Sequence, residues 1–261
     1  MDLKDLITKQ LLAGAIIGAI LGSIVVPCFH GIIRKICSWW RMTRPAQRLL
    51  QGICVQEEKC IVCLRDYFLS EEGILLSRDP SSGDARVPNV KHLWADVEAQ
   101  AVANFYHVLG QVGRGRNIQI VRASEDRNEW NCHVVILGSQ FRKATEFQTL
   151  MHQVSFRVDA DQIIDLHSGS SILRENGYGY GVIQKAINPF RTPNGDGIAF
   201  NIGGFGVLGA AAAAYYFRQH FRDLGKEFGS NCFGIVVRAP VSGGVEAVQR
   251  LAQWDRVHGD C

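Results

Sequence analysis

Several signatures of catalysis are missing from this chain of 261 residues. It has no G-x-S-x-G nucleophile motif, and none of its eight histidines stands in an H-x-x-x-H pair. The acids at Asp159, Asp161 and Asp165 lack the glycine and the terminal glutamate of a calcium loop. Asp96 and Glu98 stand two apart on a predicted helix, so they do not face one another. The sequence therefore defines no acid–base pair, and an enzyme is not the favoured interpretation.

A second C-x-x-C motif is also missing. Cys60 and Cys63 form one such motif, but no other pair stands at zinc-site spacing. The apolar sequence "CIVCL" favours a strand with buried thiols, so we predict no metal site. The eight cysteines are dispersed, and we expect them to be unpaired in a reducing compartment.

Charge is missing from the 19 residues between Leu11 and Phe29. As a helix this run is about 28 Å long, close to the hydrocarbon thickness of a bilayer. No small-x-small cleavage site follows it, and Trp39 and Trp40 stand where interfacial anchors are expected. We predict a transmembrane helix in residues 1–36, with a buried helix of a globular domain as the alternative.

The positive charge of the chain is concentrated at this end. Residues 1–49 hold seven Lys or Arg and two acids, a net charge of +5, which leaves −2 for the rest of a chain of net charge +3. The remainder is therefore not expected to bind duplex nucleic acid. Five basic residues follow the apolar run, which predicts a single-pass protein of the bacterial inner membrane with its C-terminal domain in the cytoplasm.

Gly14, Gly18 and Gly22 stand four apart within the apolar run. This spacing places them on one helix face, where another helix can approach closely. We predict self-association of the chain through this stripe in the lipid bilayer. A channel lined by one span per chain needs about four or more copies.

Residues 37–59 read as a basic juxtamembrane connector, and residues 60–261 as one cytosolic domain. In that domain apolar runs alternate with helical patterns, which predicts a Rossmann-like α/β fold with a largely parallel sheet. The predicted strands are 59–64, 117–123, 132–138, 179–187, 197–203 and 232–239, and the predicted helices are 95–112, 142–154, 207–221 and 243–253.

The sequence "GFGVLG" places Gly204, Gly206 and Gly209 in a G-x-G-x-x-G pattern between a predicted strand and a predicted helix. Such glycines permit a tight turn, and the helix N-terminus offers N–H donors to a phosphate. Arg238 ends the next strand, where a dinucleotide fold offers an acid to a ribose, and it is suited to a phosphate instead. The alternative is that the glycines only let the helix pack closely on the sheet.

A second strand-to-helix turn lies in "ILGSQ", at Gly138, Ser139 and Gln140. Ligands of open α/β sheets bind beyond the carboxyl ends of strands, although ordinary helix capping is an alternative. The predicted ligand-binding residues are Gly138, Ser139, Gln140, Asn201, Gly203, Gly204, Gly206, Gly209 and Arg238. The expected ligand is a nucleotide, and no other cofactor is predicted.

This organisation, with "ILGSQ" and "NIGGFGVLG", resembles the transmembrane effectors of prokaryotic nucleotide-signalling antiviral defence systems. In that family a membrane segment is joined to a Rossmann-like sensor domain of the CARF or SLOG type. The resemblance implies an oligomeric effector that binds a nucleotide or oligonucleotide signal and forms a channel or disrupts the membrane. A membrane-tethered enzyme acting on a nucleotide or NAD and a non-catalytic scaffold are the alternatives.

Overall fold

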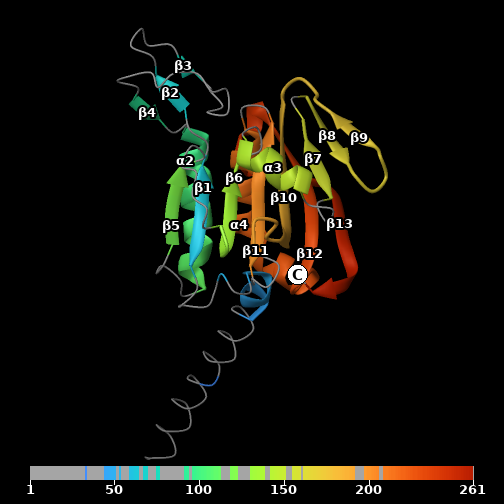
Figure 1. Ribbon diagram of the computed structural model, residues 1–261. Coiled ribbons are helices and arrows are strands. Elements are labelled where there is room, and N and C mark those ends of the chain that lie inside the picture. Colours follow the sequence, from blue (N-terminus) through green and yellow to red (C-terminus); the bar gives the residue numbers. More distant parts are fainter. Residues whose placement is uncertain are drawn as a thin grey trace, which may run out of the picture. The chain divides into compact units, whose positions relative to one another are not determined.

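The computed structural model divides the chain into two compact units, Met1–Arg44 and Pro45–Cys261, and the second is the subject below (Figure 1). The residues that the structure describes are 33, 44–50, 53, 59–64, 67–69, 75–76, 91–93, 96–112, 118–122, 130–138, 142–150, 155–159, 161–191, 197–205 and 208–260.

A seven-stranded sheet forms the centre of the second unit, with the strand order β13-β12-β10-β11-β6-β1-β5. Its strands are β1 (Cys60–Leu64), β5 (Ile118–Arg122), β6 (His133–Leu137), β10 (Tyr178–Ile187), β11 (Ile198–Phe205), β12 (Asn231–Pro240) and β13 (Gln249–Asp260). All of these strands except β13 were predicted from the sequence and are confirmed. β13 replaces the helix predicted over 243–253.

The prediction of a largely parallel sheet is wrong, because the sheet is mixed. β5, β1, β6 and β11 are parallel neighbours, whereas the pairings β11–β10, β10–β12 and β12–β13 are antiparallel. The connections explain the difference. Residues 188–197 and 241–248 are shorter than the dozen or so residues that a parallel crossover needs.

Helices cover both faces of this sheet. α2 (Asp96–Gln111) and α4 (Gly209–Glu227) pack on one face, where Phe105 and Phe217 stack with ring centroids 6.1 Å apart. α3 (Arg142–Leu150) buries Ala144 and Phe147 against the other face. All three helices were predicted from the sequence and are confirmed.

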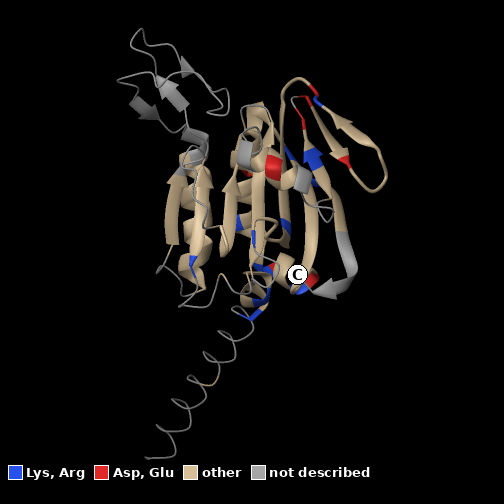
Figure 2. Ribbon diagram, in the orientation of Figure 1, with Lys and Arg blue, Asp and Glu red and all other residues tan. Residues whose placement is uncertain are grey.

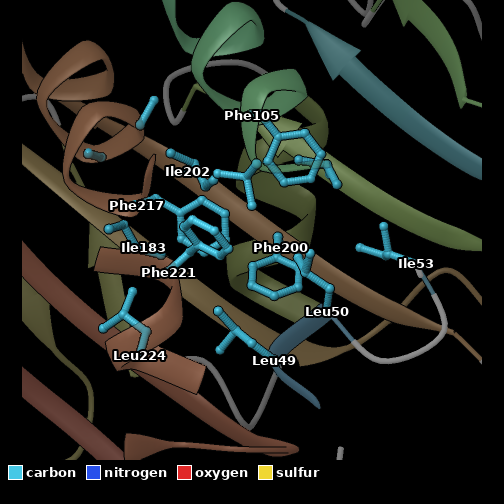
Figure 3. Packing of buried hydrophobic residues seen from close by; sticks show 14 of the residues in the cluster. Leu49, Leu50, Ile53, Phe105, Ile183, Phe200, Ile202, Phe217, Phe221 and Leu224 are labelled. Atoms are coloured by element: carbon cyan, nitrogen blue, oxygen red, sulfur yellow. The ribbon is translucent and has the colours of Figure 1, made fainter. Parts of the chain in front are cut away.

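The core beneath α2 and α4 also contains the segment that precedes β1 (Figure 3). Residues 45–50 are helical, and Leu49, Leu50 and Ile53 are buried against Phe200 and its neighbours. Gly225 of α4 lies so close to the backbone of Pro45 that a Cβ atom there would overlap it. Part of the stretch predicted as a connector is thus a component of the domain core.

Two small sheets extend the fold. β2 (Tyr67–Leu69), β3 (Leu75–Leu76) and β4 (Lys91–Leu93) follow β1, and β7 (Phe156–Val158), β8 (Gln162–Asp165) and β9 (Ser171–Leu173) follow α3. Both are antiparallel and neither was predicted, because each strand is at most four residues long. The described strands of the main sheet carry few charges (Figure 2).

Within the described residues, no helix is long and apolar enough to cross a membrane. The longest helix described, α4, has 19 residues, but its second half carries charged residues from Arg218 to Glu227. The predictions of a transmembrane helix in residues 1–36 and of a single-pass protein in the bacterial inner membrane are therefore corrected. The predicted stripe of Gly14, Gly18 and Gly22 lies outside the described residues.

Candidate functional site

The parallel strands β1, β6 and β11 end at the same edge of the main sheet, here called the carboxyl edge. The helix that follows β6 is α3, on one face, whereas α2 and α4, which come after β1 and β11, lie on the other. The chain therefore leaves adjacent strands in opposite directions at the end of β6. Such topological switch points are where open α/β sheets bind ligands.

Gly138, directly after β6, begins the turn at this point. Its φ angle of 112° lies in a region that favours glycine. Its N–H donates to the carbonyl of Ile202 at 2.8 Å, so the turn remains tied to β11. The structure thus places Gly138 where the sequence predicted a ligand turn, and Ser139 and Gln140 lie outside the described residues.

Asn201 of β11 holds this turn from within the sheet. Its Nδ2 donates to the carbonyls of Gly138, at 2.8 Å, and Ile136, at 3.3 Å. Its Oδ1 accepts from the side-chain Nε2 of Gln148 in α3, and the side-chain Oε1 of Gln148 accepts from the N–H of Val158. Asn201 is fully buried, so its role in this structure is to position the turn from β6 to α3.

α3 begins with two basic residues, Arg142 and Lys143, and has no acid in its first turn. The N-terminus of a helix carries a partial positive charge, so cations there are unfavourable. An anion bound there would reverse this effect, because it would interact favourably with the helix dipole and with the two positive charges. The start of α3 therefore has the charge of an anion-binding turn, directly beyond the end of β6.

Two of the G-x-G-x-x-G glycines, Gly204 and Gly209, have the packing role that was the alternative to phosphate binding. Gly204 lies within β11, and Gly209 is the first residue of α4. A Cβ atom on either residue would overlap the carbonyl oxygen of Tyr180. Both glycines therefore allow α4 to approach β10 and β11 closely. Gly203 is buried in β11, and Gly206 lies outside the described residues.

Arg238 lies near the end of β12, away from Gly138. β12 is separated from β6 by β10 and β11, so the two strands are three strand spacings apart, about 14 Å. A single phosphate group does not reach both residues. The structure therefore brings together Gly138, Asn201 and the start of α3, and it places Arg238 in separate surroundings.

The cysteines of the C-x-x-C motif confirm the predicted buried strand. Cys60 and Cys63 are both buried in β1, but Cys60 belongs to the core beneath α2 and Cys63 to the core beneath α3. Since they face opposite sides of the sheet, they do not share one metal ion. Cys232 is disulfide-bonded, so the expectation that the cysteines are unpaired is wrong at that position.

Two glutamines that the sequence analysis missed support this region. Gln148 completes the network around Asn201, and Gln184 of β10 accepts the N–H groups of Ser155 and Phe156. Gln184 also donates to the carbonyl of Phe156 at 2.8 Å, which joins the β7–β9 sheet to the main sheet. For Gln184 the available signal in the sequence was the polar pair Gln184 and Lys185 within the otherwise apolar strand "GVIQKAI".

The sequence matches no protein-family model and no curated protein, so the geometry of the carboxyl edge alone carries the functional assignment.

Proposed function

We propose that residues 45–261 form a sensor domain that binds a phosphate-bearing ligand of the nucleotide type at the end of β6. The ligand phosphate lies against the turn that begins at Gly138 and against the start of α3. The observation that carries the proposal is the pair of basic residues in the first turn of α3, at a topological switch point.

Two further features support this position. Asn201 donates a buried hydrogen bond to the carbonyl of Gly138 and is itself held by Gln148, so the end of β6 is fixed before a ligand arrives. The first turn of α4, which begins at the same edge, has no side-chain cap on Leu208 and no acid, so the partial positive charge of its N-terminus is not offset there.

Charge reversal at Lys143 tests the proposal. Lys143→Glu removes a cation that attracts the phosphate and places a carboxylate at the helix N-terminus. We expect nucleotide affinity to fall at least tenfold, while the free energy of unfolding rises by up to about 1 kcal/mol. Because affinity falls while the free energy of unfolding rises, a loss of binding in this variant cannot be attributed to unfolding.

Lys226→Glu is the matched control, because it makes the same charge change in the last turn of α4. It breaks an exposed ion pair with Asp223 and opposes the helix dipole, so it lowers stability slightly. Its nucleotide affinity should equal that of the wild type.

Calorimetric titration of the full chain with ATP and with NAD, followed by chromatography of the ligand, completes the test. Saturable binding with intact ligand is expected of a sensor. Turnover would instead support an enzyme. Absence of binding, or equal affinity in Lys143→Glu and the wild type, would contradict the proposal.

A further inference from the structure

Arg238 is part of a second polar cluster at the carboxyl edge, together with Tyr178, Tyr180 and Glu175. Arg238 and Tyr180 are register partners on β12 and β10. The Arg238 guanidinium carbon lies 4.9 Å above the ring centroid of Tyr178, and its side chain is 31% exposed. The cation is therefore held in place by an aromatic ring and accessible to solvent.

The carboxylate that faces Arg238 is a loose partner. Glu175 Oε2 lies 3.7 Å from Arg238 Nη1, beyond the 2.7–2.9 Å typical of a charge-assisted hydrogen bond. The Glu175 side chain is 60% exposed and is free to turn into solvent. An exposed pair of this kind contributes little stability.

Tyr180 supplies a hydroxyl that has no acceptor. Its ring is fully buried and stacks on Phe205, with centroids 5.1 Å apart. In the part of the chain that the structure describes, the hydroxyl proton has no acceptor. Burial and the charge of Glu175 raise the pKa of Tyr180. The Arg238 side chain and the Glu175 N–H, which act as donors to the phenolic oxygen, only partly oppose this, so the hydroxyl keeps its proton at neutral pH.

A buried hydroxyl without an acceptor is unfavourable, and an incoming oxyanion removes that cost. Arg238 offers the planar donor fork that matches phosphate, and Tyr180 offers one more donor on the same face of the sheet. We propose that Arg238 and Tyr180 bind a phosphate group, which displaces the Glu175 carboxylate. Arg238 is three strand spacings, about 14 Å, from β6, and Tyr180 is two, about 10 Å, so the site is separate from the proposed nucleotide site and does not depend on it.

The experiment uses inorganic phosphate as the probe and the full chain as the protein. The thermal unfolding midpoint is followed against phosphate concentration at constant ionic strength, because a ligand of the folded state raises it by mass action. We expect Arg238→Gln to abolish the response of this site and Tyr180→Phe to weaken the apparent affinity at least fivefold. Glu175→Gln removes the internal competitor and should strengthen it about threefold.

Arg250→Gln is the control, since Arg250 is also paired with a carboxylate, Glu227, and lies 5.5 Å from the ring centroid of Phe228. Arg250→Gln should lower the thermal unfolding midpoint without changing how that midpoint depends on phosphate concentration. If Arg238→Gln does not fold, Tyr180→Phe and Glu175→Gln still decide the matter. An unchanged phosphate response in Tyr180→Phe, or a weaker one in Glu175→Gln, overturns the proposal.

The same assay distinguishes the two proposed sites. Lys143→Glu should retain the phosphate response that depends on Arg238. A response lost in Lys143→Glu but intact in Arg238→Gln would support the nucleotide site at the end of β6 and refute the site described here.

Discussion

Replacement of Gly204 by alanine tests why the G-x-G-x-x-G glycines are present. The new Cβ atom would overlap the carbonyl oxygen of Tyr180 and lie 2.8 Å from backbone atoms of Gly181 and Gly209. Ordinary carbon contacts are 3.5–4.0 Å, so β10 and the first turn of α4 must each move away from Gly204 by about 0.7 Å or more. Backbone atoms of both elements resist this movement.

The expected cost follows from the packing of α4, which buries ten residues, Phe217 among them. Overpacking of a core usually costs 1–3 kcal/mol, and this rigid site should lie at the upper end, about 3 kcal/mol. With a denaturant dependence of about 2 kcal/mol per molar, the urea midpoint falls by about 1.5 M.

Gly110→Ala is the control for this experiment. Gly110 is an exposed glycine in α2, and no atom lies within 4 Å of its added Cβ. Alanine there should raise the free energy of unfolding by up to about 1 kcal/mol. If Gly204→Ala unfolds within about 0.5 kcal/mol of the wild type and instead loses nucleotide binding, the packing role is refuted and the phosphate-binding role of the motif is restored.

Three further predictions concern the core, the turn and a surface hairpin. Leu50→Ala should lower the free energy of unfolding by about 2–5 kcal/mol in urea titration, because Leu50 is fully buried, and a fragment beginning at residue 60 should be less stable still. Asn201→Leu should cost about 2–4 kcal/mol, since it removes the donor to Gly138 and leaves Gln148 buried without its acceptor; a loss below about 1 kcal/mol would contradict the network. Burial alone would raise the pKa of Asp165, but hydrogen bonds from the N–H groups of His167 and Ser168 and from the Ser168 hydroxyl lower it overall. A lowered pKa stabilises the fold above about pH 4 and the effect is lost in more acidic solution, so Asp165→Asn should cost less than about 1 kcal/mol at pH 7 and nothing near pH 2.

The secondary structure of the larger elements could be predicted because apolar runs and helical spacing are local properties. Strand direction is not local, and the length of the connection was the better guide. Only ten residues separate β10 from β11, too few for a helical crossover. Residues 243–253 were predicted as a helix, yet Ala252 and Trp254 pack on one side of β13 with the period of a strand.

Only the part of the candidate site that depends on local sequence could be predicted. Gly138 follows an obvious strand, and its turn could be located from the sequence. The role of Gly204 depends on Tyr180, which is 24 positions earlier in the chain, so no local pattern reveals it. Lys143 and the start of its helix could both be predicted from the sequence, whereas the topological switch point beside them became clear only from the strand order.

Hydrogen–deuterium exchange of the full chain, with and without the nucleotide that calorimetry selects, tests the central claim most directly. The account predicts slower exchange for amides 137–144 and for the first turn of α4, at residues 209–212. It predicts no change at the opposite edge of the sheet, at residues 231–233. Slower exchange confined to β13 or to the β7–β9 sheet, with residues 137–144 unaffected, would contradict a ligand site at the end of β6.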